Sequence, residues 1–312
     1  MKRYSLIFLT VLSFWFVCTP LFSQDEWRRL ARGPFVLACH EEDVRNGENV
    51  MSIVEEVYPR IAEDLGLLVM GRVTIVIASS EREFHVITGG QIPEWGVGAA
   101  DPSRAILFLK SPGFSQPETN FRQVVVHELS HVMLGMAVEG RVVDRWFDEG
   151  FAQFESGERG LSGAVLLAKS LLGGQALRLD EIDEVLTFRR DKAALAYEES
   201  RAAVEYLVDT YGKDVIPRIV RVLGEGKGMD EVFLSNLGIG FQEFQMEWFR
   251  AMKHTYRWYI LLDLPLVFSV ILIVLLFTAF FITRRRIQQR RRIWEEEALY
   301  GIERLEEDST PG

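Results

Sequence analysis

Cysteine, histidine and net positive charge are scarce in this sequence. Its two cysteines are Cys18 and Cys39. Because Cys18 lies in a segment expected to be removed, neither a disulfide framework nor a cysteine metal cluster is available. The formal net charge is −10, which argues against binding of nucleic acid. No repeat and no low-complexity tract interrupts the chain, so its central part is expected to fold around one sizeable core.

The N-terminus has the plan of a secretory signal peptide. In residues 1–23, two basic residues precede an apolar run from Leu6 to Val17, and the small residue Ser23 follows. This order predicts a signal peptide that is cleaved after Ser23. An uncleaved N-terminal anchor is the alternative, because the stretch has no A-x-A cleavage site.

A second long apolar run lies near the C-terminus. Residues 264–283 carry no charge, and about 20 such residues suffice for a helix to cross a bilayer. Trp258 and Tyr259 precede the run, and six arginines lie within residues 284–292. A buried core helix, the alternative, would leave no place for so dense a charge block at its end. We therefore expect a single transmembrane segment over residues 258–283.

The arginine cluster also predicts the topology, because positive charge gathers on the cytoplasmic side of a span. Residues 24–257 would lie outside the cytoplasmic (inner) membrane, and residues 284–312 would form a cytoplasmic tail. The tail begins with arginines and ends with acidic residues, and it indicates no particular partner. The form of the leader is that of a bacterial protein. The lipid bilayer is thus one expected partner of the chain.

Hydropathy patterns in the external part predict an α+β domain. Pro59 is expected to kink or break the first helix, and Asn120 with Gln123 forms a capping box at the start of another. Strands precede most helices, which indicates a small mixed sheet followed by helices rather than alternating βαβ units. The expected strands cover residues 35–39, 73–78 and 105–110. The expected helices cover residues 48–66, 191–211 and 241–256. Another is capped by Asn120, and a further one starts with residues 146–155 and ends at Gly157.

The stretch VVVHELSHVML, residues 124–134, carries the chemistry. On a helix, His127 and His131 lie on one face and can bind one cation, while Glu128 is rotated by about 100° and flanks the same place. The spacing fits H-E-x-x-H, in which the glutamate takes a proton from a metal-activated water. A buried helix with two satisfied core histidines is the alternative. Leu134 and Ala137 exclude the metalloprotease branch that has a third histidine after a glycine.

A third ligand must therefore come from elsewhere, because catalytic zinc usually has three protein ligands and one open position. Glu149, in WFDEGFAQF at the start of the next expected helix, is the candidate. It has an alternative explanation as an acidic residue favoured by the helix dipole in a first turn.

HELSH followed by WFDEGFA resembles the gluzincin metallopeptidases, and more closely the bacterial peptidase MA-like proteins. Similarity extends through GVGAADPSRAILFLK, AYEESRAAVEYLVDTYG and SNLGIGFQEFQMEWF, and so covers most of residues 33–253. The resemblance implies a zincin-like fold and hydrolysis of peptide or protein substrates. It implies one Zn²⁺ per chain, held by His127, His131 and Glu149, with Glu128 as the general base.

The resemblance implies further roles around this centre. Tyr197 would donate to the oxyanion, although Tyr197 could instead belong to an apolar stripe at helical spacing. Apart from the resemblance, Asp144 and Asp148 are candidates to orient the histidines, as carboxylates often do around zinc, with solvent-facing side chains as the alternative. Residues 105–110 would form the sheet edge along which the substrate pairs. Gluzincin aminopeptidases hold the free amine with a glutamate in G-A-M-E-N, and residues 96–100, GVGAA, lack it. An endopeptidase is therefore expected.

Two functions compete at this point. The first is a membrane-anchored zinc endopeptidase in which Glu128 accepts a proton from zinc-activated water. The second is a catalytically silent zincin-like module that serves binding or assembly in the cell envelope.

Overall fold

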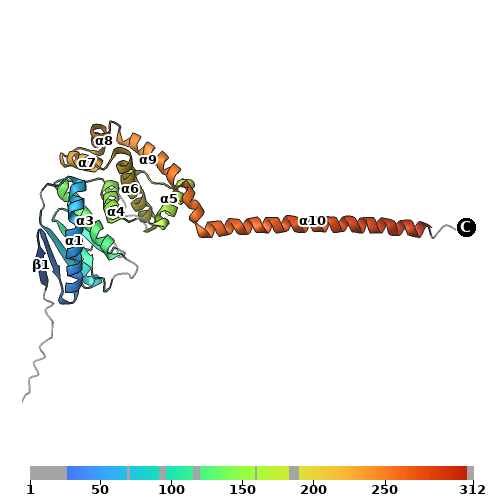
Figure 1. The fold of residues 1–312 in the computed structure, drawn as a ribbon, viewed down its shortest axis with the longest axis horizontal. Coiled ribbons are helices and arrows are strands. Elements are labelled where there is room, and N and C mark those ends of the chain that lie inside the picture. Colours follow the sequence, from blue (N-terminus) through green and yellow to red (C-terminus); the bar gives the residue numbers. More distant parts are fainter. Residues whose placement is uncertain are drawn as a thin grey trace, which may run out of the picture.

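The computed structural model describes residues 27–307 apart from 69–70, 91–95, 115–119, 159 and 183–189. The expected signal peptide, residues 1–23, lies outside the described residues. Sheet and helices together make a head from which one long helix projects at the end farthest from β1 (Figure 1). In chain order the elements are β1 (Arg28–Arg32), β2 (Phe35–Cys39), η1 (Glu41–Asp43), α1 (Val44–Leu65), β3 (Val73–Ala78), α2 (Glu81–Ile87), β4 (Gly98–Asp101), β5 (Ile106–Lys110), α3 (Phe121–Ala137), α4 (Arg145–Ser156), α5 (Leu161–Gly173), α6 (Arg190–Tyr211), α7 (Val215–Gly224), α8 (Met229–Leu237), α9 (Phe241–Tyr256), η3 (Arg257–Leu262) and α10 (Leu264–Glu307).

The strands form one mixed sheet in the order β1-β2-β3-β5-β4. The central strands β2, β3 and β5 run parallel, whereas β1 and β4 are antiparallel to their neighbours. The prediction of a small mixed sheet followed by many helices is confirmed, although α1 and α2 lie between strands in the chain. Strands β1 and β4 were missed, because RRLAR and GAAD lack the β-branched and aromatic residues that signal strands.

The prediction that residues 105–110 form the sheet edge is wrong. Strand β5 begins at Ile106 and lies between β3 and β4. The edge strand on this side of the sheet is β4, which pairs with β5 from Gly98 opposite Leu109 to Asp101 opposite Ile106. The turn between the two strands ends at Ala105, whose φ of 54° is left-handed. Pairing across this turn adds the short strand outside β5, and no local pattern reveals that.

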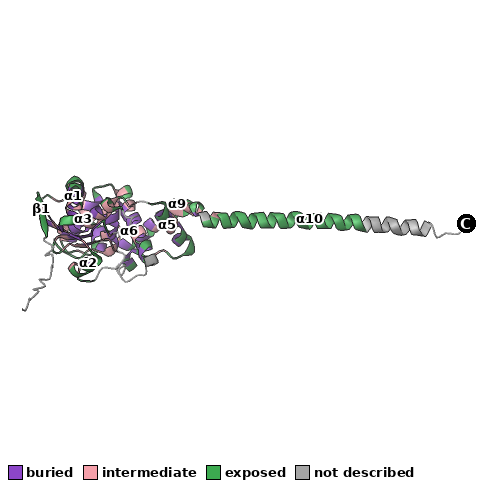
Figure 2. Ribbon diagram, turned by 90° about the horizontal axis from the view of Figure 1, so that it is seen from below, coloured by how far each residue is buried: buried purple, intermediate pink, exposed green. Residues whose placement is uncertain are grey.

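Alternation along the strands divides the apolar side chains between two faces of the sheet. One face joins the main core, where α1 and α3 cover it through residues such as Leu37, Ile75 and Leu107. The other face holds a small cluster of Ala78, Ala99 and Phe108 under Phe84 of α2. Buried residues fill the head, whereas the long helix is exposed (Figure 2). Helix α3 thus packs on one face of the sheet, within the main core.

Helix ends largely follow the expected signals. The side chain of Asn120 accepts a hydrogen bond from the amide of Gln123 at the start of α3. Gly157 closes α4 with a left-handed φ of 69°. Pro59 does not break α1, which runs from Val44 to Leu65. Pro59 and Glu55 both lie on the exposed side of that helix, so the carbonyl that loses its partner faces solvent.

Helix α4 is held by a cluster of aromatic side chains. Trp146 is completely buried and stacks on Phe241 of α9, with ring centroids 5.7 Å apart. Phe233 of α8 and Phe244 of α9 complete the cluster around it. Helix α4 also packs across α3 and along α6. Packing of α8 and α9 on Trp146 therefore holds the first turn of α4 in place next to α3.

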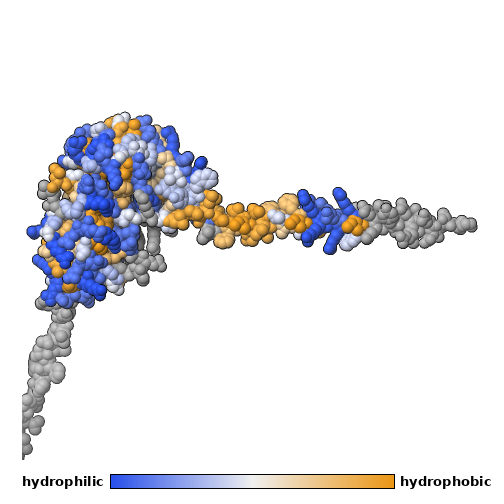
Figure 3. All heavy atoms as spheres, in the orientation of Figure 1, coloured by the Kyte–Doolittle hydropathy of each residue, from blue (hydrophilic) through white to orange (hydrophobic). Residues whose placement is uncertain are grey.

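Helix α10 extends without interruption from Leu264 to Glu307. Within the described residues, Pro265–Trp294 is the one helical segment long and apolar enough to cross a membrane, and none of its most apolar part is buried. Its hydrophobic surface ends at the arginines of residues 284–292, which Figure 3 shows as a blue band beyond the orange one. Length and composition thus agree with the expected span.

Glu199 of α6 provides a test of the core that is independent of any site. Its side chain is fully buried, and its two carboxyl oxygens lie 3.1 and 3.2 Å from the amide of Leu177, which donates to them. Burial raises the pKa of Glu199 to about 8 from a normal value of 4.5. Because the folded state keeps this proton longer than the unfolded chain, stability falls as pH rises from 4.5 towards 8.

Replacing the acid by an isosteric amide removes this pH-dependent cost. Gln in place of Glu199 keeps an acceptor for Leu177, so Glu199→Gln should match the parent near about pH 5 and exceed its stability by roughly 2–4 kcal/mol above about pH 8. Denaturant unfolding of the chain in detergent at both pH values measures the difference. Glu42→Gln, at an exposed position, is the control. An equal effect of Glu199→Gln at both pH values would contradict the prediction.

Candidate metal centre

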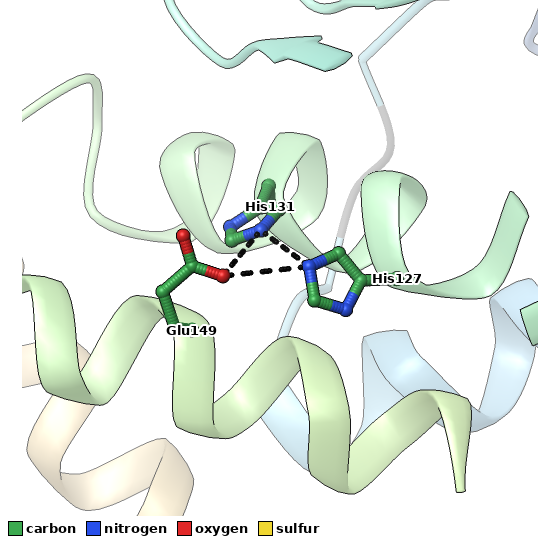
Figure 4. Close-up of side chains that lie close together, drawn as sticks. All are labelled: His127, His131 and Glu149. Atoms are coloured by element: carbon green, nitrogen blue, oxygen red, sulfur yellow. Dashed lines mark hydrogen bonds and ion pairs between the residues drawn. The ribbon is translucent and has the colours of Figure 1, made fainter. Parts of the chain in front are cut away.

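Two helices bring three ligand-type side chains together. His127 and His131 lie one turn apart on α3, and Glu149 comes from α4, which crosses it. The two imidazole Nε2 atoms are 3.1 Å apart. Oε2 of Glu149 lies 3.4 Å from Nε2 of His127 and 3.5 Å from Nε2 of His131 (Figure 4). The structure thus brings together the three residues that the motifs singled out.

The separations of these three atoms fit a metal ion. Bonds of about 2.0–2.1 Å in tetrahedral geometry place ligand atoms about 3.3–3.4 Å apart, close to the three distances observed. Two imidazole nitrogens and one carboxylate oxygen also form the donor set of many catalytic zinc sites. Within the described part of the chain, this is the group of His, Cys, Asp and Glu side chains that could hold a metal ion.

Further carboxylates and an arginine fix the orientation of the three side chains. Nδ1 of His131 lies 2.5 Å from Oδ1 of Asp148, which turns Nε2 towards the centre. Nδ1 of His127 lies 3.3 Å from Oε1 of Glu158. Nη2 of Arg145 lies 2.8 Å from Oε1 of Glu149, so the other oxygen of that carboxylate faces the histidines.

Two of these supporting residues were missed from the sequence. Arg145 stands four residues before Glu149 on α4, so helical i,i+4 spacing could have indicated it. Glu158 follows the helix in a loop, and no motif points to it. Of the two aspartates expected to orient histidines, Asp148 contacts His131. Asp144 precedes α4, and its carbonyl oxygen accepts from the amides of the first turn.

Glu128 lies beside the three-residue centre, against the edge strand. A Cβ added at Gly98 of β4 would be 2.6 Å from Cγ and 2.8 Å from Oε1 of Glu128. Glycine at this position therefore makes room for the Glu128 side chain. Both residues line a cavity of about 440 Å³, together with His127, His131 and Glu149. The Glu128 carboxyl group and an open space thus adjoin the candidate metal ligands.

A second glycine brings Tyr197 to the same cavity. A Cβ at Gly150 would collide with the carbonyl oxygen of Ser200, so α4 and α6 approach through this glycine. Tyr197 lies about one turn before Ser200 and lines the cavity. It also packs, half-buried, against the core. The core-stripe explanation and the site explanation of Tyr197 are therefore compatible.

Burial and neighbouring charges shift the pKa values of the ionisable side chains at the centre. Burial opposes protonation of His127, but the nearby carboxylates of Glu149 and Glu158 outweigh it and raise the pKa of His127 to about 10. Burial also opposes protonation of His131, yet Asp148 and Glu149 raise its pKa well above the usual value. Against its burial, the histidines and Arg145 hold the pKa of Glu149 well below the usual value. Burial raises the pKa of Glu128, although the two histidines oppose the rise.

The family profile of the Peptidase MA superfamily matches residues 56–254, which contain the sheet edge, the centre and its supporting helices. The chain belongs to the Peptidase MA superfamily. A search of curated proteins found no significant similarity.

Membership of the Peptidase MA superfamily gives the cluster a chemical meaning. The domain is peptidase-like, and peptidases of this superfamily are typically metal-dependent hydrolases. In a peptidase of this superfamily, a group of His127, His131 and Glu149 that could hold a metal ion is the candidate active centre.

Metal binding at this centre should release protons. Without a metal, the carboxylates keep His127 and His131 protonated near neutral pH, and an ion must displace those protons. We expect Zn²⁺ titrated into the protein to release roughly one to two protons near neutral pH, with affinity rising up to about tenfold per pH unit for each proton displaced. Calorimetry in buffers of different ionisation enthalpy counts these protons. An affinity that is equal at about pH 6 and about pH 7.5 would refute this linkage.

Proposed function

We propose that the chain is a membrane-anchored zinc metallopeptidase of the gluzincin type that acts as an endopeptidase. The observation that carries the proposal is the convergence of His127, His131 and Glu149 at tetrahedral spacing beside Glu128 in an open cavity. An N,N,O donor set with one open position suits a catalytic zinc ion. HELSH and WFDEGFA supply these residues from adjacent helices, as in the gluzincin arrangement.

The chain's own side chains then divide the work of peptide hydrolysis. Bound zinc would supply Lewis acidity towards a water molecule and the scissile carbonyl. Glu128 accepts a proton from that water as the oxygen attacks the carbonyl carbon, and it returns the proton to the leaving amine as the C–N bond breaks. Gly98 gives Glu128 the room it needs against the strand. No acyl-enzyme forms on this route.

Tyr197 is suited to stabilise the negative charge that develops on the carbonyl oxygen. Burial, together with the charge of Glu149, raises the pKa of Tyr197, so its phenol keeps the proton that it donates. Its position on α6 is fixed relative to α4 by the close approach at Gly150. Tyr197 therefore lines the same cavity as the candidate metal ligands.

The edge strand β4 is the better candidate for substrate pairing, in place of the strand expected from the sequence. Gly98, Ala99 and Ala100 of β4 line the cavity, and an unpaired sheet edge can accept an extended peptide through backbone hydrogen bonds. Small side chains leave space above the strand and add little sequence preference. Residues 96–100 supply no carboxylate for a free amine, so the arrangement favours cleavage within a chain.

Helix α10 supports anchoring in the membrane. Its apolar segment is exposed, and it lies between an exposed Trp258 and the arginines of residues 284–292. Interfacial aromatic residues at one end and arginines at the other are typical of a span whose arginine end is cytoplasmic. The peptidase domain would then face the outside of the cytoplasmic membrane.

Substitution of single residues should separate metal binding from catalysis. His127→Ala and Glu149→Ala each remove one ligand, so both should lose most of the zinc found in the parent, which we expect to hold about one ion per chain. Glu128→Gln should keep the zinc and lower peptide hydrolysis by about 10²–10⁴-fold, because only the base is lost. Elemental mass spectrometry and cleavage of an unstructured protein measure the two effects.

Two results would argue against this assignment. A folded parent protein that binds no zinc when zinc is offered would make HELSH a structural helix. If the protein keeps its cellular function when Glu128 is replaced by Gln, the result would instead favour a zincin-like module for binding or assembly. The exposed substitution Glu42→Gln serves as the matched control for expression and folding.

The role of Tyr197 has its own test. Tyr197→Phe removes only the hydroxyl, so it should lower kcat by about 10²–10³-fold and leave KM and zinc content nearly unchanged. Tyr206→Phe is the matched control, because Tyr206 lies on the same helix and packs on Phe244 in the core. Steady-state kinetics on both variants gives the comparison. Equal, small effects would reduce Tyr197 to a packing residue.

A further inference from the structure

The outer face of α5 is unusually apolar for a surface helix. Leu161 and Leu172 are 59% and 64% exposed, and Val165 is half-buried on the same side. Lys169 is the one charged residue in the α5 sequence, LSGAVLLAKSLLG. A surface helix normally presents charged and polar residues on the side that faces away from the core. Something other than water is therefore expected to cover this face.

The apolar face continues onto the neighbouring segment η3. None of the residues of Arg257–Leu262 is buried, and Trp258, Leu261 and Leu262 are 64%, 61% and 48% exposed. Helix α5 packs against η3. We call the exposed residues of these two elements the α5–η3 patch; it consists of Leu161, Leu172, Trp258, Leu261 and Leu262.

The patch lies directly at the start of the apolar helix α10. Nζ of Lys169 lies 2.5 Å from Oδ2 of Asp263, the residue that precedes α10, so the charge on α5 is paired with the base of that helix. Figures 1 and 2 both show α5 at the end of the head from which α10 departs. In Figure 3 the hydrophobic surface of α10 begins at the edge of the head. Patch and apolar helix are thus one continuous surface.

Charge around the patch differs from that of the rest of the chain. No acidic residue occurs between Trp248 and Leu262, although the whole chain carries a net charge of −10. Lys253 lies over the ring of Phe249 at 4.7 Å, and Arg257 over that of Trp258 at 5.0 Å. Cations beside aromatic rings at the border of an apolar surface suit the headgroup layer of a bilayer with anionic lipids.

We propose that the α5–η3 patch rests in the interfacial layer of the bilayer that α10 enters, so that the head is seated on the membrane instead of being held away from it. The inference rests on the proposed membrane anchoring. A lipid surface is the occupant because the patch is continuous with the apolar helix and carries interfacial Trp and basic residues. An apolar helix face of this kind inserts about 5–10 Å into the headgroup and acyl boundary.

Seating the patch on the bilayer also places the candidate active centre near the membrane. Glu158, which lines the cavity and contacts His127, stands three residues before Leu161. Three residues span at most about 11 Å, so this wall of the cavity lies close to the headgroup layer. Polypeptide segments next to the membrane surface would then be the substrates that reach the cavity most easily.

Depth-dependent quenching tests the inference on the full chain. Leu172→Cys, Val142→Cys and Phe277→Cys, each in a Cys18→Ser background, would carry a fluorescent label; Cys39 is fully buried and stays unlabelled. Val142, which is 96% exposed in the loop between α3 and α4, is the matched control, and Phe277 reports on the apolar helix. The proteins are reconstituted in vesicles of phosphatidylcholine and phosphatidylglycerol with spin-labelled lipids.

We expect severalfold stronger quenching at position 172 than at position 142, with a shallow spin label more effective than a deep one. Leu161→Glu should weaken the quenching at position 172, because it places a charge in the patch. Quenching at 277 with none at 172 would show a head that stands off the membrane and would overturn the inference. Absence of quenching at 277 would instead refute membrane anchoring itself. Protection of position 172 from aqueous iodide without lipid quenching would assign the patch to a second copy of the chain and overturn its assignment to lipid.

Discussion

The buried carboxylate of Glu149 is the constraint on which the rest of this structure depends. An isolated carboxylate with so little exposure would cost several kcal/mol, and here two imidazoles and one guanidinium compensate it. The compensation requires α4 to cross α3 at one place, with Arg145 holding one oxygen and the histidines facing the other. This crossing of α3 and α4 also brings together the three atoms that suit a metal ion. One packing arrangement therefore both compensates the buried charge and forms the candidate metal centre.

The domain has two halves, the sheet with α3 and the helices that follow α3, and each contributes different parts of the site. The sheet supplies the edge strand β4 and supports α3, which carries His127, Glu128 and His131. The C-terminal helices supply Glu149 and Tyr197, and they hold α4 in place through the buried Trp146 and its aromatic neighbours. The cavity forms where the halves meet. Glycines at positions 98 and 150 allow the close approaches there, because any larger side chain would displace Glu128 or separate α4 from α6.

The path from the cavity to the apolar helix is short. The chain leaves α4, passes Glu158 at the cavity wall and enters α5, whose Lys169 pairs with Asp263 at the base of α10. A peptidase domain connected in this way differs physically from one on a flexible linker. The orientation of its cavity relative to a bilayer would follow from the packing of α5 and η3, and access to the cavity would depend on how a substrate lies at the membrane surface.

The sequence by itself determined the features that arise from short-range periodicity. Helical spacing puts His127 and His131 on one face, Asn120 and Gly157 mark helix ends, and the uncharged run before residues 284–292 predicts the exposed apolar helix. Only the tertiary structure decided which strand forms the edge, because β4 is defined by pairing with β5 and not by its own composition. It also decided that Glu158 lies beside His127, and that Leu161 and Leu172 on the outer face of α5 are exposed. Such contacts depend on how distant segments pack, and no local pattern encodes that packing.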